Sequence, residues 1–236
     1  MIRLQDYTPD RLVSIIACVS NEQRWEQCAK RISSQVLPRG FHREYIPVRG
    51  AASICAGYNE GLRRARGRYK LYLHQDVLLL KPNVIKDLLA VFDRHPDAGI
   101  AGIAGSVSLP DNAAWYTAAL SDCYMHVLET RGAGVRCVVG NVWTDRDVEA
   151  AVADGLLLMT AVDIPWREDL FRGWHMYDIA QCFEMRARGY HLYLPQQQTP
   201  WVLHDTRKLS DESADLQHWR DVFLEHYGGR RELFHV

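Results

Sequence analysis

Short apolar runs alternate with helical patterns through residues 12–106, and this alternation limits the folds that the chain can adopt. The run Leu12–Val19 is rich in β-branched residues and predicts a buried strand. Further strands are predicted at 44–48, 69–75 and 99–106, with helices at about 21–32, 51–66 and 82–95, the last beginning at Pro82. This order predicts an α/β fold, a mostly parallel sheet flanked by helices. Ligands of such sheets bind outside the carboxyl ends of the strands, where Asn21 and Asp76 stand.

The second half of the chain is less regular. Residues 107–147 predict mostly loop with a short helix near 112–120, and residues 148–153 fit a helix or a strand. The remaining expected elements are a strand at 156–162, a helix at 176–189, a strand at 190–194, an extended segment at 201–204 and an amphipathic helix from 211 onward, with Trp219 and Phe223 facing inward.

Composition excludes several classes of protein. With 47% hydrophobic residues, the chain can bury a core without disulfide or metal crosslinks. The 28 Lys and Arg residues nearly balance 29 Asp and Glu residues, which removes the electrostatic argument for nucleic acid or an anionic membrane as a partner. The six cysteines form no CxxC pair and are expected to be reduced. We expect a cytoplasmic protein without an integral membrane segment, because no signal-peptide pattern occurs and the densest apolar stretch, Leu156–Val162, is too short to span a bilayer.

Three polar positions stand out as candidates for chemistry. Asp76, in His74-Gln75-Asp76, follows a predicted strand, where a carboxylate could hold a divalent cation against a diphosphate or could simply cap a turn. Asp178 lies in the first turn of a predicted helix, where the dipole favours an ionised carboxylate, as a general base requires, although acidic residues are common there. His204 ends an extended run and is a possible metal ligand or a hydrogen-bonded structural residue.

Other motifs are less informative. Trp166, Trp174 and Trp201 could stack against sugar rings or belong to the core. The basic run at 63–68 suits a solvated helix C-terminus. The sequence contains no P-loop, dinucleotide fingerprint, GxSxG or HExxH motif.

Taken in order, several segments resemble the glycosyltransferases of the GT-A fold, in a family-2-like branch with HQD in place of DxD. The opening segment 15–22 looks like the first strand and nucleotide-binding turn of that family. The other segments are similar to its helix-to-strand, metal, acceptor and base motifs: Ala56–Leu62 with Ala65–Tyr69, Leu73–Val77, Val152–Met159, Trp174–Ile179 with Arg188–Tyr190, and His204.

The resemblance implies a single glycosyltransferase domain over residues 1–236. Residues of about 12–106 would form its nucleotide-binding half, about 107–205 its acceptor and catalytic half, and 206–236 a helical tail. The implied reaction is inverting transfer of a sugar from a nucleotide diphosphate sugar, in particular a UDP-sugar, to a hydroxyl of a glycan or another acceptor.

The resemblance also implies roles for individual residues. Asp178 would be the general base. Asp76 and His204 would hold Mg²⁺ or Mn²⁺, with each ligand atom roughly 2.0–2.2 Å from the ion. The nucleotide would contact Ser20, Asn21, Glu22, His74 and Asp76, and the acceptor or donor sugar would contact Asp154, Trp174 and His175. His74 is expected to contact ribose or diphosphate rather than the metal, and Asn59 to fix the helix-to-strand geometry.

Two departures from the family pattern leave an alternative open. The metal motif contains a single aspartate, and Ala180 stands where many relatives carry a second acidic residue. The alternative is a catalytically inactive nucleotide- or sugar-binding module of the same fold. A nucleotidyltransferase is a third possibility, against which the missing glycine- and lysine-rich loop counts. Exposed aromatics are compatible with a homodimer, but no heptad pattern requires one.

Overall fold

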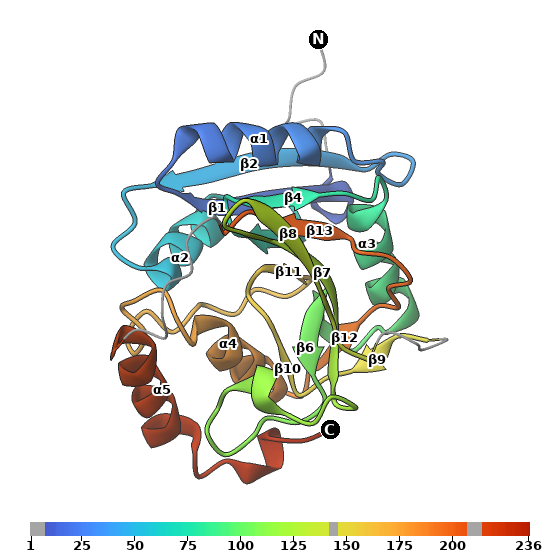
Figure 1. Cartoon of the computed structure of the whole chain (residues 1–236). Coiled ribbons are helices and arrows are strands. Elements are labelled where there is room, and N and C mark those ends of the chain that lie inside the picture. Colours follow the sequence, from blue (N-terminus) through green and yellow to red (C-terminus); the bar gives the residue numbers. More distant parts are fainter. Residues whose placement is uncertain (1–7, 142–145, 207–213) are drawn as a thin grey trace.

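The computed structural model describes residues 8–141, 146–206 and 214–236, which form two β-sheets with helices packed around them (Figure 1). The larger sheet has the strand order β2-β1-β3-β11-β5-β12-β9. Its strands are β1 (Leu12–Val19), β2 (His42–Arg49), β3 (Tyr69–Leu73), β5 (Ala98–Gly102), β9 (Val148–Glu149), β11 (Leu157–Thr160) and β12 (His191–Leu194). The helices are α1 (Glu22–Ser33), α2 (Ile54–Arg64), α3 (Val84–Arg94), α4 (Tyr177–Arg186) and α5 (Ala214–Tyr227). The predicted α/β fold with flanking helices is confirmed.

Burial on both faces explains the apolar run at the start of the chain. Every residue of β1 is buried. Ile15 belongs to the hydrophobic cluster that includes α1 and α3, whereas Ile16 belongs to the cluster that includes α2 and α4. A strand covered by helices on both sides has no solvent face, so it does not alternate with polar residues. The polar exception, Ser14, donates its hydroxyl hydrogen to Glu44 Oε1 at 2.7 Å.

The larger sheet is mixed, whereas a mostly parallel one was expected. β1 is parallel to both β2 and β3, and β12 is parallel to β5, but β11 runs antiparallel between β3 and β5. This reversal pairs Leu157, at the start of β11, with Leu73, at the end of β3. The turn before β11 therefore lies at the same edge of the sheet as His74, whose N–H donates to Leu156 O at 3.2 Å.

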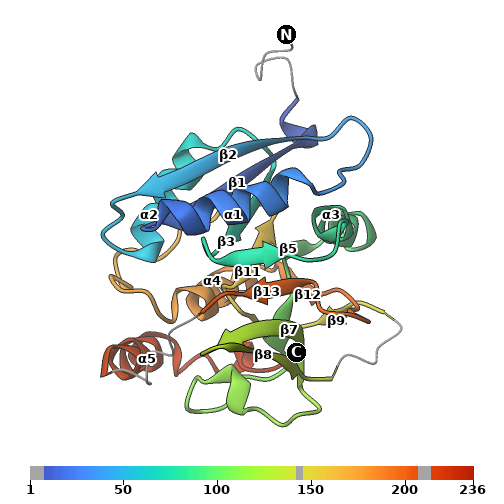
Figure 2. The ribbon, with the colours of Figure 1, turned by 45° about the horizontal axis from the view of Figure 1, so that its top comes forward.

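The smaller sheet brings a late segment of the chain next to the end of β3. Its order is β10-β6-β7-β13-β4, with β8 paired to β7, and Figure 2 shows β4, β13, β7 and β8 stacked one below another. Its strands are β4 (Val77–Leu79), β6 (Ala104–Ser106), β7 (Cys123–Arg131), β8 (Gly134–Val139), β10 (Val152–Ala153) and β13 (Val202–His204). Because β13 pairs with β4 and sets His204 opposite Val77, the late histidine lies beside Asp76.

Several expected elements need correction. The loop expected at 107–147 contains the β7–β8 hairpin, and a 3₁₀ turn at Trp115–Thr117 replaces the short helix expected near 112–120. The strand expected at 99–106 divides at Ile103 into β5 and β6, which belong to different sheets. Pro82 precedes α3 without being its first residue, because Asn83 takes the N-cap position. The segment 148–153, which fitted a helix or a strand, contains the short strands β9 and β10.

The last helix, α5, agrees with the amphipathic pattern expected from the sequence, over the residues that the structure describes. α5 starts at Ala214, and the expected start at 211 lies outside the described residues. Phe223 is buried and Trp219 packs against the core, as expected.

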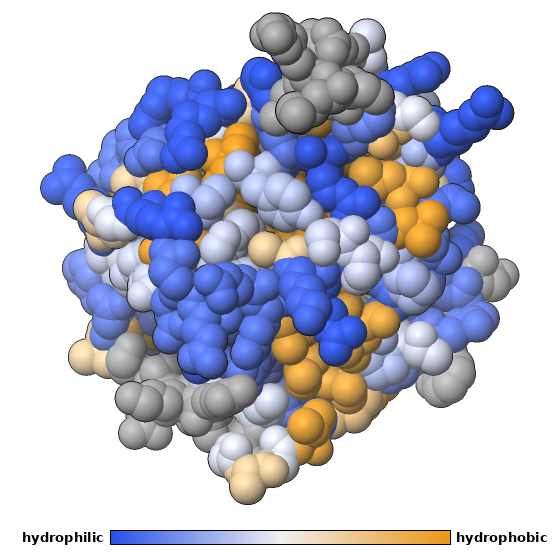
Figure 3. Space-filling model, turned by 90° about the horizontal axis from the view of Figure 1, so that it is seen from above, coloured by the Kyte–Doolittle hydropathy of each residue, from blue (hydrophilic) through white to orange (hydrophobic). Residues whose placement is uncertain are grey.

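The face that carries α1 and β2 is mainly hydrophilic with scattered apolar patches (Figure 3). This agrees with α1, whose Trp25, Cys28 and Ile32 are buried while its acidic and amide side chains are exposed. Across the described ranges, no helix is long and apolar enough to cross a membrane.

Candidate active site

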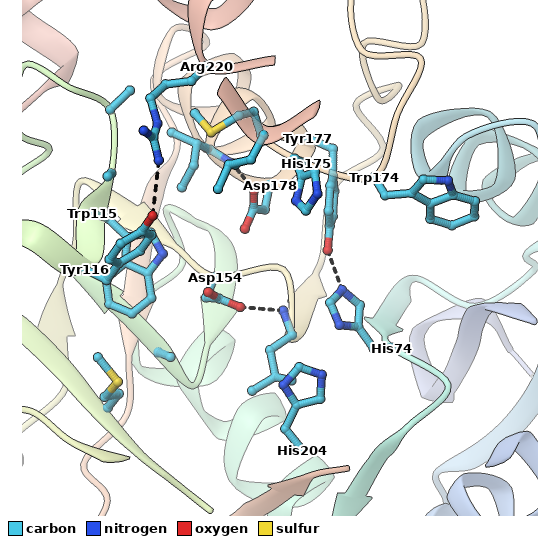
Figure 4. A pocket seen from close by; sticks show the side chains of 18 of the residues that line it. His74, Trp115, Tyr116, Asp154, Trp174, His175, Tyr177, Asp178, His204 and Arg220 are labelled. Carbon is cyan, nitrogen blue, oxygen red and sulfur yellow. Dashed lines mark hydrogen bonds between the residues drawn. The ribbon is translucent and has the colours of Figure 1, made fainter. Parts of the chain in front are cut away.

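A cavity of about 320 Å³ opens between the two sheets, beside the start of α4 and one face of α5 (Figure 4). Six of the residues predicted from the sequence line this cavity: His74, Asp154, Trp174, His175, Asp178 and His204. Figure 4 shows Asp154 and Asp178 between the imidazoles of His74 and His204 on one side and the rings of Trp115 and Tyr116 on the other. The cavity thus has a histidine side, a pair of central carboxylates and an aromatic side.

The His74-Gln75-Asp76 segment links this cavity to the end of β1. Gln75 Oε1 accepts from the backbone N–H groups of Ser20, at 3.0 Å, and Asn21, at 2.8 Å, and Gln75 Nε2 donates to Ser20 Oγ at 2.8 Å. Gln75 therefore fixes the β1–α1 turn, while its two neighbours in sequence, His74 and Asp76, point to the opposite side, toward His204. Sequence alternation had correctly separated Gln75 from His74 and Asp76.

Three side chains from this region form a potential metal-ligand cluster. His74, Asp76 and His204 each offer one ligand atom, and these atoms lie within 4.8 Å of one another. His204 Nε2 is 3.5 Å from Asp76 Oδ1, so the expected convergence of these two residues is confirmed. His74 was expected to lie further back, but it belongs to the same cluster.

The protonation states of the cluster suit a cation. Burial, and then the nearby His204, lower the pKa of His74 to about 4, which leaves a neutral imidazole with a free electron pair. Burial alone would raise the pKa of Asp76, but the hydrogen bond from His204 and the nearby His74 and Arg24 lower it, so the carboxylate is ionised at neutral pH. Two imidazole nitrogens and one carboxylate oxygen are a donor set that fits a divalent transition metal.

Arg24 is part of this site but was not singled out from the sequence. Its Nη1 lies 3.0 Å from Asp76 Oδ2, and both side chains are partly buried. Arg24 stands in the first turn of α1, where the dipole disfavours a cation. This unfavourable position was the sequence signal that could have singled out Arg24, because a carboxylate partner offsets the cost of an arginine there.

Asp178 projects into the cavity from the first turn of α4. Its Oδ2 accepts from Gly155 N at 2.8 Å and its Oδ1 from Ile179 N at 2.9 Å. Burial, and then the charge of Asp154, raise the pKa of Asp178 to about 7 despite these hydrogen bonds. The helix N-terminus was expected to keep this group strongly acidic, but desolvation outweighs it, so the carboxylate is more basic than the sequence indicated.

Tyr177 connects the base candidate to the histidines. Its hydroxyl lies 2.6 Å from His74 Nε2, and it is the residue directly before Asp178. A Cβ on Gly155 would lie 2.2 Å from this hydroxyl oxygen, so the Asp154-Gly155 pair allows the tyrosine to reach His74. Tyr177 was not identified from the sequence, because the contact joins residues 103 positions apart.

The segment between β11 and α4 is fastened to α2 by Asn59. The Asn59 amide donates to Trp166 O and accepts from Trp166 N, both at 2.8 Å. Asn59 was expected to fix the helix-to-strand geometry, and the observed contact instead anchors the segment that leads to Trp174 and His175. His175 Nε2 lies 3.8 Å from Asp215 Oδ2 of α5, and the indole of Trp174 is 48% exposed and points away from the carboxylates in Figure 4.

Two predicted nucleotide contacts are turned away from the cavity. The Asn21 side chain caps α1 by accepting from Arg24 N at 3.1 Å. The Glu22 carboxylate pairs with Arg49 at 2.6 Å, and both side chains are more than half exposed. The structure therefore brings Ser20 next to Gln75 but does not bring the Asn21 or Glu22 side chain to the cluster of histidines and carboxylates.

Comparisons with known proteins show the family and the fold of the chain. A family model described as "Glycosyltransferase like family" matches residues 14–227. The chain belongs to this family. The enzyme class predicted from the sequence, a glycosyltransferase, is thereby confirmed. A comparison with curated proteins gives no match.

Solved structures with a similar fold are distant in sequence. The mannosyltransferase PcManGT from Pyrobaculum calidifontis, in complex with GDP-Man and Mn²⁺, shares 12% identity at a TM-score of 0.56, over 96% of this chain and 67% of that one. Residues 1–349 of S. aureus TarS, in complex with UDP-GlcNAc, share 11% identity at a TM-score of 0.56, over 86% of this chain and 61% of that one. This glycosyltransferase thus has the fold of GT-A enzymes and spans about two thirds of each relative.

Proposed function

We propose that this glycosyltransferase moves a sugar from a nucleotide diphosphate sugar to an acceptor hydroxyl with inversion, and that Asp178 is the general base. The observation that carries the proposal is the position of Asp178 in the cavity, with a pKa raised to about 7. A base works best when its pKa lies near the working pH, because it is then both ionised and able to accept a proton. Direct attack by the deprotonated acceptor on the anomeric carbon inverts its configuration.

The division of the cavity supports this assignment. The histidine cluster would face the diphosphate of the donor, and the aromatic side would face the acceptor, with the two carboxylates between them. Residues of about 12–106 would then supply most donor contacts and residues 107–205 the acceptor contacts, while His204 joins the donor side from the second half.

A divalent cation would be held by Asp76, His74 and His204. When bound, it would neutralise charge on the departing diphosphate. We propose Mn²⁺ ahead of Mg²⁺, because imidazole nitrogen suits transition metals whereas Mg²⁺ prefers an all-oxygen shell. Arg24, which lies beside Asp76, would add positive charge for the diphosphate.

The donor is proposed to be a UDP-sugar, as expected from the family-2-like resemblance. S. aureus TarS has been solved with UDP-GlcNAc, while PcManGT has been solved with GDP-Man, so both nucleotides belong in the test. Ser20, held by Gln75, is the nucleotide contact that the geometry favours at the end of β1.

The test is the Asp178→Asn variant assayed with UDP- and GDP-sugars in the presence of Mn²⁺. We expect turnover to fall by about 10²-fold or more while nucleotide affinity is unchanged, because the amide keeps the shape but cannot accept the proton. Equal turnover by variant and parent would overturn the role of Asp178. Nucleotide binding without turnover on any donor and acceptor would instead support the inactive binding module.

A further inference from the structure

The aromatic side of the cavity is a built wall that the sequence did not reveal. It is formed by Ala113, Trp115, Tyr116, Met125, Val127 and Leu216. The 3₁₀ turn contributes its rings, β7 contributes Met125 and Val127, and α5 covers the wall with Leu216. Aromatic and aliphatic surfaces of this kind bind the C–H face of a sugar ring.

Hydrogen bonds hold this wall in one conformation. Tyr116 OH accepts from Arg220 Nη2 of α5 at 3.1 Å, and Asn112 Oδ1 accepts from Ala114 N at 3.0 Å. Thr117 Oγ1 donates to Ala114 O at 2.8 Å. In the described part of the chain, the only non-glycine residues with positive φ are Ala113 and Met176, and both line this cavity. The wall is therefore preorganised, which lowers the entropy cost of binding.

Two carboxylates lie beside the wall, and the guanidinium of Arg220 lies at its edge, bound to Tyr116. Asp154 Oδ1 accepts from Leu156 N at 2.8 Å, and Asp178 accepts from two further backbone N–H groups. These donors are uncharged, so they orient the carboxylates without cancelling their charge. An anionic group on the acceptor near its reacting hydroxyl would meet the negative charge that Asp154 and Asp178 carry in a partly desolvated site, which is unfavourable.

We propose that this wall is the acceptor subsite, and that it selects an uncharged sugar or glycoside over an anionic one. This inference rests on the proposed function, since it assigns the acceptor of the same site. The whole cavity, which the donor would share, holds about 320 Å³, near the lower limit for ligand sites, so the wall has room for one sugar ring of a larger acceptor. Arg220 is engaged by Tyr116 and Gln217 and serves to hold the wall.

The experiment uses a matched pair of probes, 4-nitrophenyl glucoside and 4-nitrophenyl glucuronide, which differ only at the sixth carbon. Binding of each to the full chain is measured by calorimetry in the presence of UDP and Mn²⁺. We expect the glucoside to bind at least about 10-fold more tightly than the glucuronide. Equal affinity, a preference for the glucuronide, or no binding of the glucoside would overturn the inference; a preference for the glucuronide would point to Arg220 as an anion contact.

Variants separate the wall from the rest of the site. Trp115→Ala should weaken glucoside binding by about 10-fold, and Trp115→Phe should restore part of it, because an aromatic face is worth about 0.5–1.5 kcal/mol. Leu120→Ala is the control, since Leu120 follows the same turn but is 72% exposed. UDP affinity should be unchanged in all three variants, which also shows that they fold. Unaltered glucoside binding by Trp115→Ala would overturn the inference, whereas the proposed function is tested separately, by the turnover of the parent and of Asp178→Asn.

Discussion

The ionisation of Asp178 depends on its burial in the cavity and on the nearby charge of Asp154, which both raise its pKa. Because the pKa of Asp178 is raised to about 7, its ionised fraction increases as the pH rises through neutrality. We expect kcat/KM to rise over the same pH range, which gives the pH profile an ascending limb, since the base accepts a proton only when it is ionised. The measurement is kcat/KM between about pH 5 and 9 at saturating metal.

Asp154→Asn is the matched variant for this profile. It removes the like charge that is the second cause of the raised pKa, so the pKa of Asp178 falls and the limb moves to lower pH. A limb that stays in place in Asp154→Asn would show that another group controls the profile.

Tyr177 is a positioning residue for His74, because its hydroxyl meets His74 Nε2 at 2.6 Å. A partner of this kind fixes the ring orientation of a metal ligand, and its loss typically costs about 10–100-fold in metal affinity. We expect Tyr177→Phe to weaken Mn²⁺ binding by that factor and to leave metal-free UDP binding unchanged. Tyr58→Phe is the control, because Tyr58 is an equally buried aromatic neighbour whose hydroxyl makes no hydrogen bond within the described chain. The same loss in both variants would contradict the positioning role.

At the scale of elements, the close approach of α2 to β1 depends on Gly61. A Cβ there would lie 2.3 Å from Ile16 Cγ2 in the buried interface. We expect Gly61→Ala to destabilise the protein by about 1 kcal/mol or more, because overpacking costs about 1–3 kcal/mol and outweighs the gain in helix propensity. The measurement is the urea midpoint of unfolding. Gly229→Ala is the control, since nothing lies within 4 Å of its added methyl group, and equal midpoints for the two variants would contradict the close packing.

The elements also explain which parts of the molecule the sequence could predict. Continuous apolar runs such as β1 were predictable, because burial on both faces leaves a simple pattern. The β7–β8 hairpin was not, because Met125 and Val127 of β7 face a cavity while Val135 and Val139 of β8 are exposed, so no alternation of buried and polar residues marks it. The reversal of β11 was equally hidden, since strand direction depends on the path of the whole chain.

The same limit applies to the site. Asp76, Asp178 and His204 were predicted from the order of motifs along the chain. Pairings of distant strands then bring His204 beside Asp76 and the turn before β11 beside His74. Contacts between distant residues left no local signal: Tyr177 reaches His74 across 103 positions and Arg24 reaches Asp76 across 52. Sequence patterns report local structure and burial, whereas the partners of a polar side chain depend on the tertiary fold.

At the scale of the whole molecule, the metal cluster connects both halves of the chain, because His74 and Asp76 lie in the β3–β4 turn and His204 ends β13. A ligand that binds this cluster only in the folded state should therefore stabilise both halves of the chain. We expect UDP with Mn²⁺, at about 100 times the dissociation constant, to add about 2.7 kcal/mol, which corresponds to a rise in Tm of roughly 5–11 °C. Mg²⁺ should give a smaller rise, because the cluster offers two nitrogen ligands.

His204→Ala should abolish the metal-dependent part of the shift and His235→Ala, at an exposed position, should retain it. A full Mn²⁺-dependent shift in His204→Ala would mean that the cation binds without β13, and the two halves of the chain would then not share a metal site.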